Sequence, residues 1–201
     1  MLAAIYDDPF DDQLRSVYAD ALIEQGDPHG ELIQLQLQAA PSSEARRRIG
    51  QLLAKHERTW LGPIAPVVAK GGVEFRRGFV AVCKAKFKNE QDVRAYGSHP
   101  AWATVEELTH AVGAWSSGAQ YRWSCWIDPA MKSLTSVRLH DVNAAELLDT
   151  PVPWNLRRLV FGTSDVDTLA RLAVTDTLPK LESLWIDRPA RGWIATARCV
   201  R

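Results

Sequence analysis

The sequence lacks the features that mark membrane, secreted and strongly charged proteins. No apolar run approaches the ~20 residues that span a bilayer, and the first residues contain no basic stretch of a secretory signal. Lysine plus arginine and aspartate plus glutamate both number 24, so no net charge attracts nucleic acid or an anionic membrane. We therefore expect a cytoplasmic protein that does not bind membranes.

Cysteine and histidine are too sparse and too scattered for a disulfide framework or a zinc site. Cys83, Cys125 and Cys199 are odd in number and widely spaced, which favours reduced, partly buried thiols. None of the five histidines has the spacing of a zinc motif, and no glycine-rich phosphate loop is present. We expect neither a metal nor a cofactor.

Three short patterns contain reactive residue types, but each has a simpler structural explanation. The Asp-x-His-x-Glu pattern at 27–31 lies at an expected helix start, where Asp caps and Glu favours the helix dipole. Its spacing also keeps the three side chains off one helix face. His140 and Asp141 are neighbours on an expected strand and face opposite ways. Cys125 has no charged neighbour to activate its thiol. We therefore expect no catalytic residues and a protein that is not an enzyme.

The first 62 residues predict a helical module. Asp8-Pro9 is a helix start signal, and Asp27-Pro28 repeats it after Gly26, which suits the left-handed residue that ends a helix. Between the two signals runs an apolar stripe with helical spacing: Leu14, Val17, Tyr18, Ala21 and Leu22. Apolar and polar residues alternate over 32–38, as they do in a strand. The helix start signal at Asp27-Pro28 and the lack of a turn before Pro41 nevertheless favour a helix. A third helix is predicted from Ser43 to near Trp60, with arginines 46–48 outward.

A dense set of residues in this module carries a family resemblance. They are Asp8-Pro9, Asp11-Asp12, Arg15, Val17-Tyr18-Ala19-Asp20, Leu22, Glu24, Gly26-Asp27-Pro28 and Gly30-Glu31. The set resembles the repeat-companion domain, a short helical module at the N-terminus of many bacterial proteins with leucine-rich-type repeats. The segments 56–63 and 75–79 are similar to those that link this module to its repeats. The resemblance implies a repeat region downstream and brings no catalytic residues.

The second half repeats one pattern: an apolar residue, two others, an apolar residue, one other and an apolar residue. It occurs at 134–139, 156–161 and 181–186, with a looser copy at 105–110. The starts are 29, 22 and 25 residues apart, within the ~20–29 residues of a leucine-rich repeat. The pattern resembles the strand of that repeat. Residues 143–148 and 165–173 are expected as helical returns, and residues 113–129 as an irregular insert rich in tryptophan.

These observations together predict an α/β fold in three parts. Residues 1–62 form the helical module, and residues 63–100 form a linker and a capping β-hairpin that turns at Arg77-Gly78. A short helix capped by Asn89 follows. Residues 101–201 form a short leucine-rich-repeat-like solenoid with a mainly parallel, curved sheet, closed by a lid from the C-terminal tail.

Strand alternation assigns an exposed face to this sheet. If Leu134, Val137 and Leu139 point inward, their neighbours point outward. The outward residues predicted to bind a partner are Glu107, Ser136, Arg138, His140, Arg158, Val160, Ser183, Trp185 and Asp187. Stacking predicts one column of Glu107, Ser136, Arg158 and Ser183, and a second of Thr109, Arg138, Val160 and Trp185. The alternative, that the C-terminal tail covers Trp185, stays open.

The sequence therefore favours a non-enzymatic scaffold that binds another protein through the open sheet face, by shape and charge. An immunity or regulatory protein is a more specific form of this hypothesis. The tryptophan-rich insert is an alternative contact surface. A second hypothesis is a nucleic-acid-associated regulator acting through the helical module, but the segment 32–37 has no lysine or arginine for a recognition helix. An enzyme built around the insert ranks last. We expect the chain to be monomeric by itself.

Overall fold

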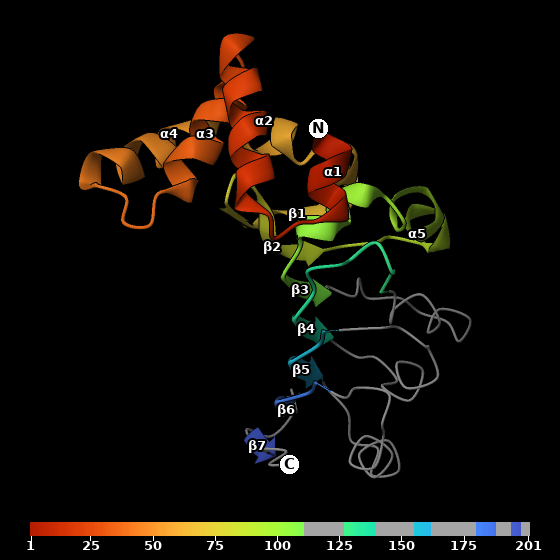
Figure 1. The fold of residues 1–201 in the computed structure, drawn as a ribbon. Coiled ribbons are helices and arrows are strands. Elements are labelled where there is room, and N and C mark those ends of the chain that lie inside the picture. The colour runs from red at the N-terminus through yellow and green to blue at the C-terminus, as the bar shows by residue number, and fades with distance from the viewer. Residues whose placement is uncertain (111–126, 140–154, 162–179, 188–193, 198–201) are drawn as a thin grey trace.

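The computed structural model of the chain describes residues 1–110, 127–139, 155–161, 180–187 and 194–197. It is a mixed α/β structure in which helices precede a mostly parallel sheet. Figure 1 shows the helical module at one end of the sheet, with the strands following one another away from it. The helical module and strand β7 (Ile194–Ala197) consequently lie at opposite ends of the described structure.

Four helices form the module: α1 (Leu2–Asp7), α2 (Asp12–Glu24), α3 (Pro28–Leu37) and α4 (Ser43–Trp60). The predicted helices α3 and α4 are confirmed, since Asp27 caps α3 and Ser42 caps α4. The predicted start of α2 at Asp8-Pro9 is wrong. Its cap is Asp11, whose Oδ1 accepts hydrogen bonds from the amides of Gln13 and Leu14 at 2.8 and 3.0 Å. Helix α1 was not predicted.

The buried face of α2 also differs from the predicted apolar stripe. Val17 is 51% exposed, whereas Arg15 is only 1% exposed and lies on the buried side with Ala19 and Leu22. A buried arginine needs acceptors for its donors, and the carbonyls of Arg77 and Pro9 accept from its two terminal nitrogens, whereas its Nε has no hydrogen-bond partner. The inner face of α2 is therefore defined by one charged residue that a hydrophobic pattern does not reveal.

The predicted hairpin is confirmed. Strands β1 (Val68–Arg76) and β2 (Phe79–Ala85) pair antiparallel, after a 3-10 helix, η1 (Gly62–Val67). Arg77 and Gly78 form a two-residue turn in which both have a positive φ, of 52° and 83°. This combination is a type I′ turn, whose twist matches that of paired strands. Strand β1 is longer than the predicted segment and contains a register shift before Val73.

The chain then reaches the sheet through two short elements. Helix α5 (Glu90–Tyr96) begins after Asn89 and ends at Gly97, as predicted. A 3-10 helix, η2 (Pro100–Thr104), follows, capped by His99. Its Thr104 Oγ1 donates to the Val80 carbonyl at 2.9 Å, which ties η2 to the hairpin.

Among the described residues the sheet has seven strands in the order of the sequence. Strands β3 (Glu107–His110), β4 (Ser136–Leu139), β5 (Arg158–Phe161) and β6 (Ser183–Asp187) are parallel to one another and to β2. The four begin at the spacings of 29, 22 and 25 residues that the repeated pattern predicts. The hairpin covers the free edge of β3, as expected, and β7 (Ile194–Ala197) pairs antiparallel with β6.

One hydrophobic core extends from the module through the hairpin to β6. Leu134, Val137 and Leu139 are buried in it, as predicted, together with Leu108 and Leu184 from neighbouring strands. A smaller core joins helices α1 to α3 to the hairpin: Ile5, Ala19, Leu22, Ile33 and Phe79. Because Phe79 follows the hairpin turn, the turn is packed into the helical module.

Several predictions lie outside the described residues. These are the returns at 143–148 and 165–173, most of the insert at 113–129, the His140-Asp141 pair, Cys125 and Cys199. The remaining thiol, Cys83, is fully buried in β2, and burial raises its pKa to about 12. None of the described helices is both long and apolar enough to cross a membrane.

Candidate functional site

The two predicted columns of outward residues are present on the sheet. Backbone pairing sets Glu107 beside Ser136, Ser136 beside Arg158 and Arg158 beside Ser183. The same register sets Thr109, Arg138, Val160 and Trp185 side by side. These two columns together form the open face. Neighbouring side chains in each column lie about 4.8 Å apart, the spacing of paired strands.

A repeated hydrogen-bonding step holds the columns in register. The Glu106 carbonyl accepts from the amides of both Thr135 and Ser136, at 2.9 and 3.0 Å. The Thr135 carbonyl accepts in the same way from residues 157 and 158, and the Arg157 carbonyl from residues 182 and 183. Each of these strands is therefore aligned in the same way with the strand before it. Residues at equal positions of the sequence pattern therefore fall in one column.

The predicted face residues differ in accessibility. Arg138 and Arg158 are exposed, and Trp185 is 38% exposed even though Thr196 of β7 pairs beside it. Val160 departs from the prediction, because it is only 8% exposed, between the longer side chains of Arg138 and Trp185. The face therefore presents two cations and one large aromatic ring above a buried aliphatic residue.

For two further predicted residues, the structure does not describe a side chain on the face. His140 lies outside the described residues, and only the backbone of Asp187 is described, paired with Ile194. Glu107, Ser136 and Ser183 are half-buried.

The starts of the strands form a shallow groove of about 230 Å³ that includes the first column of the open face. Its lining comprises Arg76, Glu106, Glu107, Thr135, Ser136, Arg157, Arg158, Glu182 and Ser183. Five of these had not been predicted, namely Arg76, Glu106, Thr135, Arg157 and Glu182. The last four occupy the second position of each repeat, so the repeated pattern itself contained the signal. Arg76 comes from β1, and only the folded hairpin brings it there.

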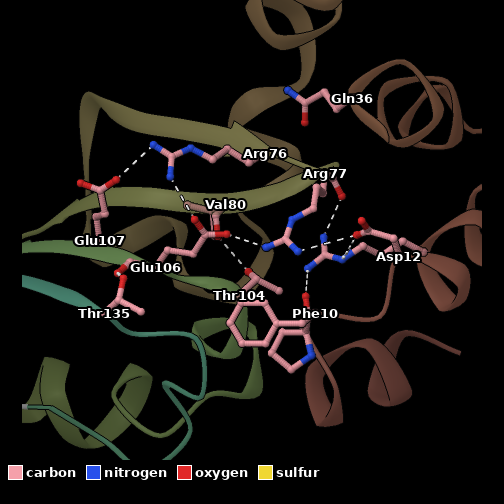
Figure 2. A network of polar contacts seen from close by, with 12 residues as sticks. Phe10, Asp12, Gln36, Arg76, Arg77, Val80, Thr104, Glu106, Glu107 and Thr135 are labelled. Carbon is pink, nitrogen blue, oxygen red and sulfur yellow. Dashed lines mark hydrogen bonds and ion pairs between the residues drawn. The ribbon is translucent and has the colours of Figure 1, made fainter. Parts of the chain in front are cut away.

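The charges at the hairpin end of the groove are already paired, as Figure 2 shows. The guanidinium of Arg76 contacts Glu74 at 2.8 Å, Glu106 at 2.9 Å and Glu107 at 3.1 Å. The hydrogen bond that Arg76 donates to Glu74, with those to the other two carboxylates, raises the pKa of Arg76. Arg77 contacts Glu106 at 2.6 Å. Both arginines are consequently engaged within the protein, and Arg76 is shared by three carboxylates.

The rest of the groove and face is less balanced. Arg157 pairs with Glu182 at 2.8 Å, and both side chains are exposed. Within the described part of the chain, Arg138 and Arg158 form no ion pair. Two positive charges therefore remain beside Trp185 after the internal pairs are counted.

The helical module holds the hairpin turn, mainly through Arg15. Its guanidinium donates to the carbonyls of Arg77 at 2.7 Å and Pro9 at 2.6 Å, and lies 4.9 Å from the centre of the Phe79 ring. Burial, and secondarily the charge of Arg77, lower the pKa of Arg15 to about 10, so it remains a cation at neutral pH. Helix α2 and the turn are thus fastened by one buried cation.

Helix α3 holds the other side of the turn. His29 Nε2 donates to the Gly78 carbonyl at 2.7 Å, and its ring stacks on Trp60 at 4.8 Å. The side-chain amide of Gln36 donates to the Phe75 carbonyl and accepts from the Gly78 amide, at 2.9 and 2.8 Å. The face of α3 that carries these residues is therefore occupied by the hairpin and is not open to a nucleic-acid groove.

The Asp-x-His-x-Glu pattern is explained by separate structural roles. Asp27 caps α3, His29 binds the turn, and Glu31 forms a two-pronged ion pair with Arg48 at 2.6 and 2.7 Å. The hydrogen bond from Arg48 lowers the pKa of Glu31. Across the described ranges, no three His, Cys, Asp or Glu side chains are grouped to hold a metal ion.

The contact of His29 predicts a pH-dependent stability. Burial lowers the pKa of His29 below its ordinary value of 6.5, against the effects of the Gly78 carbonyl and Asp27. The unfolded chain then binds the proton more readily, so the free energy of unfolding should fall as the pH drops below about 6.5. Chemical denaturation at about pH 7 and pH 5 measures this slope.

His29→Gln should flatten that slope whatever its effect on stability at neutral pH. His56→Gln is the matched control, because His56 also stacks on Trp60, at 5.1 Å, but forms no contact with the turn. An unchanged slope in His29→Gln would show that other groups control the pH dependence.

No protein-family model matches the sequence, and no curated protein or solved structure is found to be similar to it.

Proposed function

We propose that this protein is a non-enzymatic scaffold that binds another protein through the open face. In this proposal the sheet is a short leucine-rich-repeat-like solenoid behind a repeat-companion-like module. Support comes from the parallel strands in sequence order, the equal entry step of three strands, and the spacings of 29, 22 and 25 residues. The resemblance of residues 1–40 points in the same direction, because Arg15, one of the residues that carry it, binds the hairpin turn.

The observation that carries the proposal is the composition of the open face. Arg138 and Arg158 share the open face with the half-exposed Trp185, on a surface whose backbone is fixed by paired strands. Arginine and tryptophan are the residue types that most often dominate the energy of protein interfaces. A rigid sheet also costs little conformational entropy on binding.

A more specific form of the proposal is an immunity or regulatory protein that blocks another protein by occupying its surface. The open face supports this form of the proposal, because its arginines, serines and tryptophan form a contact surface of fixed shape whose groups bind rather than react. In this form of the proposal, the protein blocks its partner by covering part of the partner's surface.

Selection of binders tests the proposal directly. The full chain is immobilised and used to select from a displayed library of random linear peptides, and the affinity of the enriched peptides is measured. Trp185→Ala should weaken binding by at least about tenfold, equivalent to ~1.4 kcal/mol. Arg47→Glu, on the exposed side of α4, should leave the affinity unchanged. Peptides that bind the Trp185→Ala variant as tightly as the native protein would overturn the open face as the binding surface.

A further inference from the structure

We propose that the open face recognises an acidic segment of its partner, in which a carboxylate lies next to an aliphatic or aromatic side chain. This inference rests on the proposed function and specifies the chemistry of the partner.

The unpaired charge at the centre of the open face is positive. At the hairpin end, the guanidiniums of Arg76 and Arg77 are engaged by carboxylates of the protein itself, and farther along Arg157 pairs with Glu182. Among the described residues, the guanidiniums of Arg138 and Arg158 have no ion-pair partner. A partner with negative charge at this position gains two attractive contacts, whereas a basic partner is repelled.

The surroundings of Arg158 suit a carboxylate. Ser136 and Ser183 stand on either side of it in the same column, and all three line the groove. A guanidinium binds a carboxylate with two parallel hydrogen bonds, and the flanking hydroxyls can each donate another. A single Asp or Glu side chain of the partner fits this arrangement.

The adjacent column suits an apolar side chain. Val160 and Trp185 lie two residues beyond the strand starts, so they are one step along the strands from Arg158 and Ser183. A residue next to the partner's carboxylate reaches this position, and an aliphatic or aromatic side chain there buries apolar surface against the indole. Arg138, in the same column as Val160, accommodates a second carboxylate.

The carboxylates at the edges of the groove disfavour a nucleic acid. Glu107 lies beside Ser136 in the column, Glu182 directly precedes Ser183 in the chain, and both line the groove. A continuous phosphate backbone would approach these carboxylates, whereas a local acidic group meets only the cations between them. A peptide with separated carboxylates therefore matches the charge pattern better than a polynucleotide.

The test uses the selected peptides described above and a charge exchange. Peptides enriched on the native chain should contain Asp or Glu beside an aliphatic or aromatic residue. The affinity of the most enriched peptide, measured by fluorescence anisotropy, should fall at least about tenfold in Arg158→Glu and fall with rising salt. A synthetic peptide with that acidic residue changed to Lys should bind Arg158→Glu more tightly than it binds the native protein. Arg47→Glu should bind both peptides as the native chain does.

The outcomes separate this inference from the proposed function. Enriched peptides that are neutral or basic but lose affinity with Trp185→Ala would overturn the acidic segment and leave the open face as the binding surface. Peptides insensitive to both Trp185→Ala and Arg158→Glu would overturn both. A mixed-sequence single-stranded oligonucleotide that binds the native chain and is released by the Arg138→Glu, Arg158→Glu double variant would assign the face to nucleic acid and overturn the inference.

Discussion

Replacing Gly78 with alanine is expected to lower the free energy of unfolding by about 3 kcal/mol or more. A Cβ at this position would lie 2.9 Å from Ile33 Cβ and 3.0 Å from Ile33 Cα. These atoms belong to helix α3 and cannot turn aside as the end of a flexible side chain does. Gly78 also has a φ of 83°, which costs an L-residue ~1–2 kcal/mol, and overpacking adds ~1–3 kcal/mol.

Gly50→Ala is the matched control for this substitution. Gly50 lies on the exposed side of α4, and a Cβ there would meet nothing within 4 Å. Since alanine favours a helix over glycine, this variant should be unchanged or more stable by ~0.5–1 kcal/mol. Denaturant unfolding of both variants measures the difference. A Gly78→Ala protein as stable as Gly50→Ala would mean that the hairpin turn does not pack against α3 as described.

Replacing Arg15 with leucine is expected to cost about 2–4 kcal/mol of stability. Leucine fills most of the buried volume but leaves the carbonyls of Pro9 and Arg77 without their donor. An unsatisfied buried polar group costs ~1–3 kcal/mol, and the loss of the Arg15 cation beside Phe79 removes a further ~1 kcal/mol.

Arg47→Leu provides the comparison for Arg15→Leu, because it makes the same change on the exposed face of α4. Its effect should stay within about 0.5 kcal/mol. Equal effects of the two substitutions on the denaturation midpoint would show that Arg15 does not fasten the module to the turn.

The strands and the open face were predictable because the sequence pattern and the sheet share one geometry. In each repeat, alternate residues face opposite sides of a strand. Parallel pairing with a constant offset then turns equal positions of the pattern, such as Ser136 and Arg158, into neighbours. The hairpin turn was predictable for a similarly local reason, since Arg77-Gly78 adopts a two-residue turn between alternating strands.

Contacts between distant residues were not predictable from these patterns. The sequence pattern assigns Arg15 to the polar side of α2. Only the folded hairpin turn, 62 residues later in the chain, provides a buried acceptor for its guanidinium. The ion pairs of Arg76 with Glu106 and Glu107 likewise join residues 30 and 31 positions apart. The pairing of these charges decides which arginines of the face remain for a partner. That property follows from the tertiary structure, and the sequence pattern alone indicates only the face.

The indole resonance of Trp185 tests the central claim most directly. Tryptophan side chains are labelled with nitrogen-15, and the Trp185 signal is assigned from its loss in Trp185→Phe. On addition of the most enriched peptide, the Trp185 signal should shift, while Trp60, stacked on His29, and the buried Trp102 should not. If the signals of the helical module move and that of Trp185 stays in place, the open face is not the binding surface.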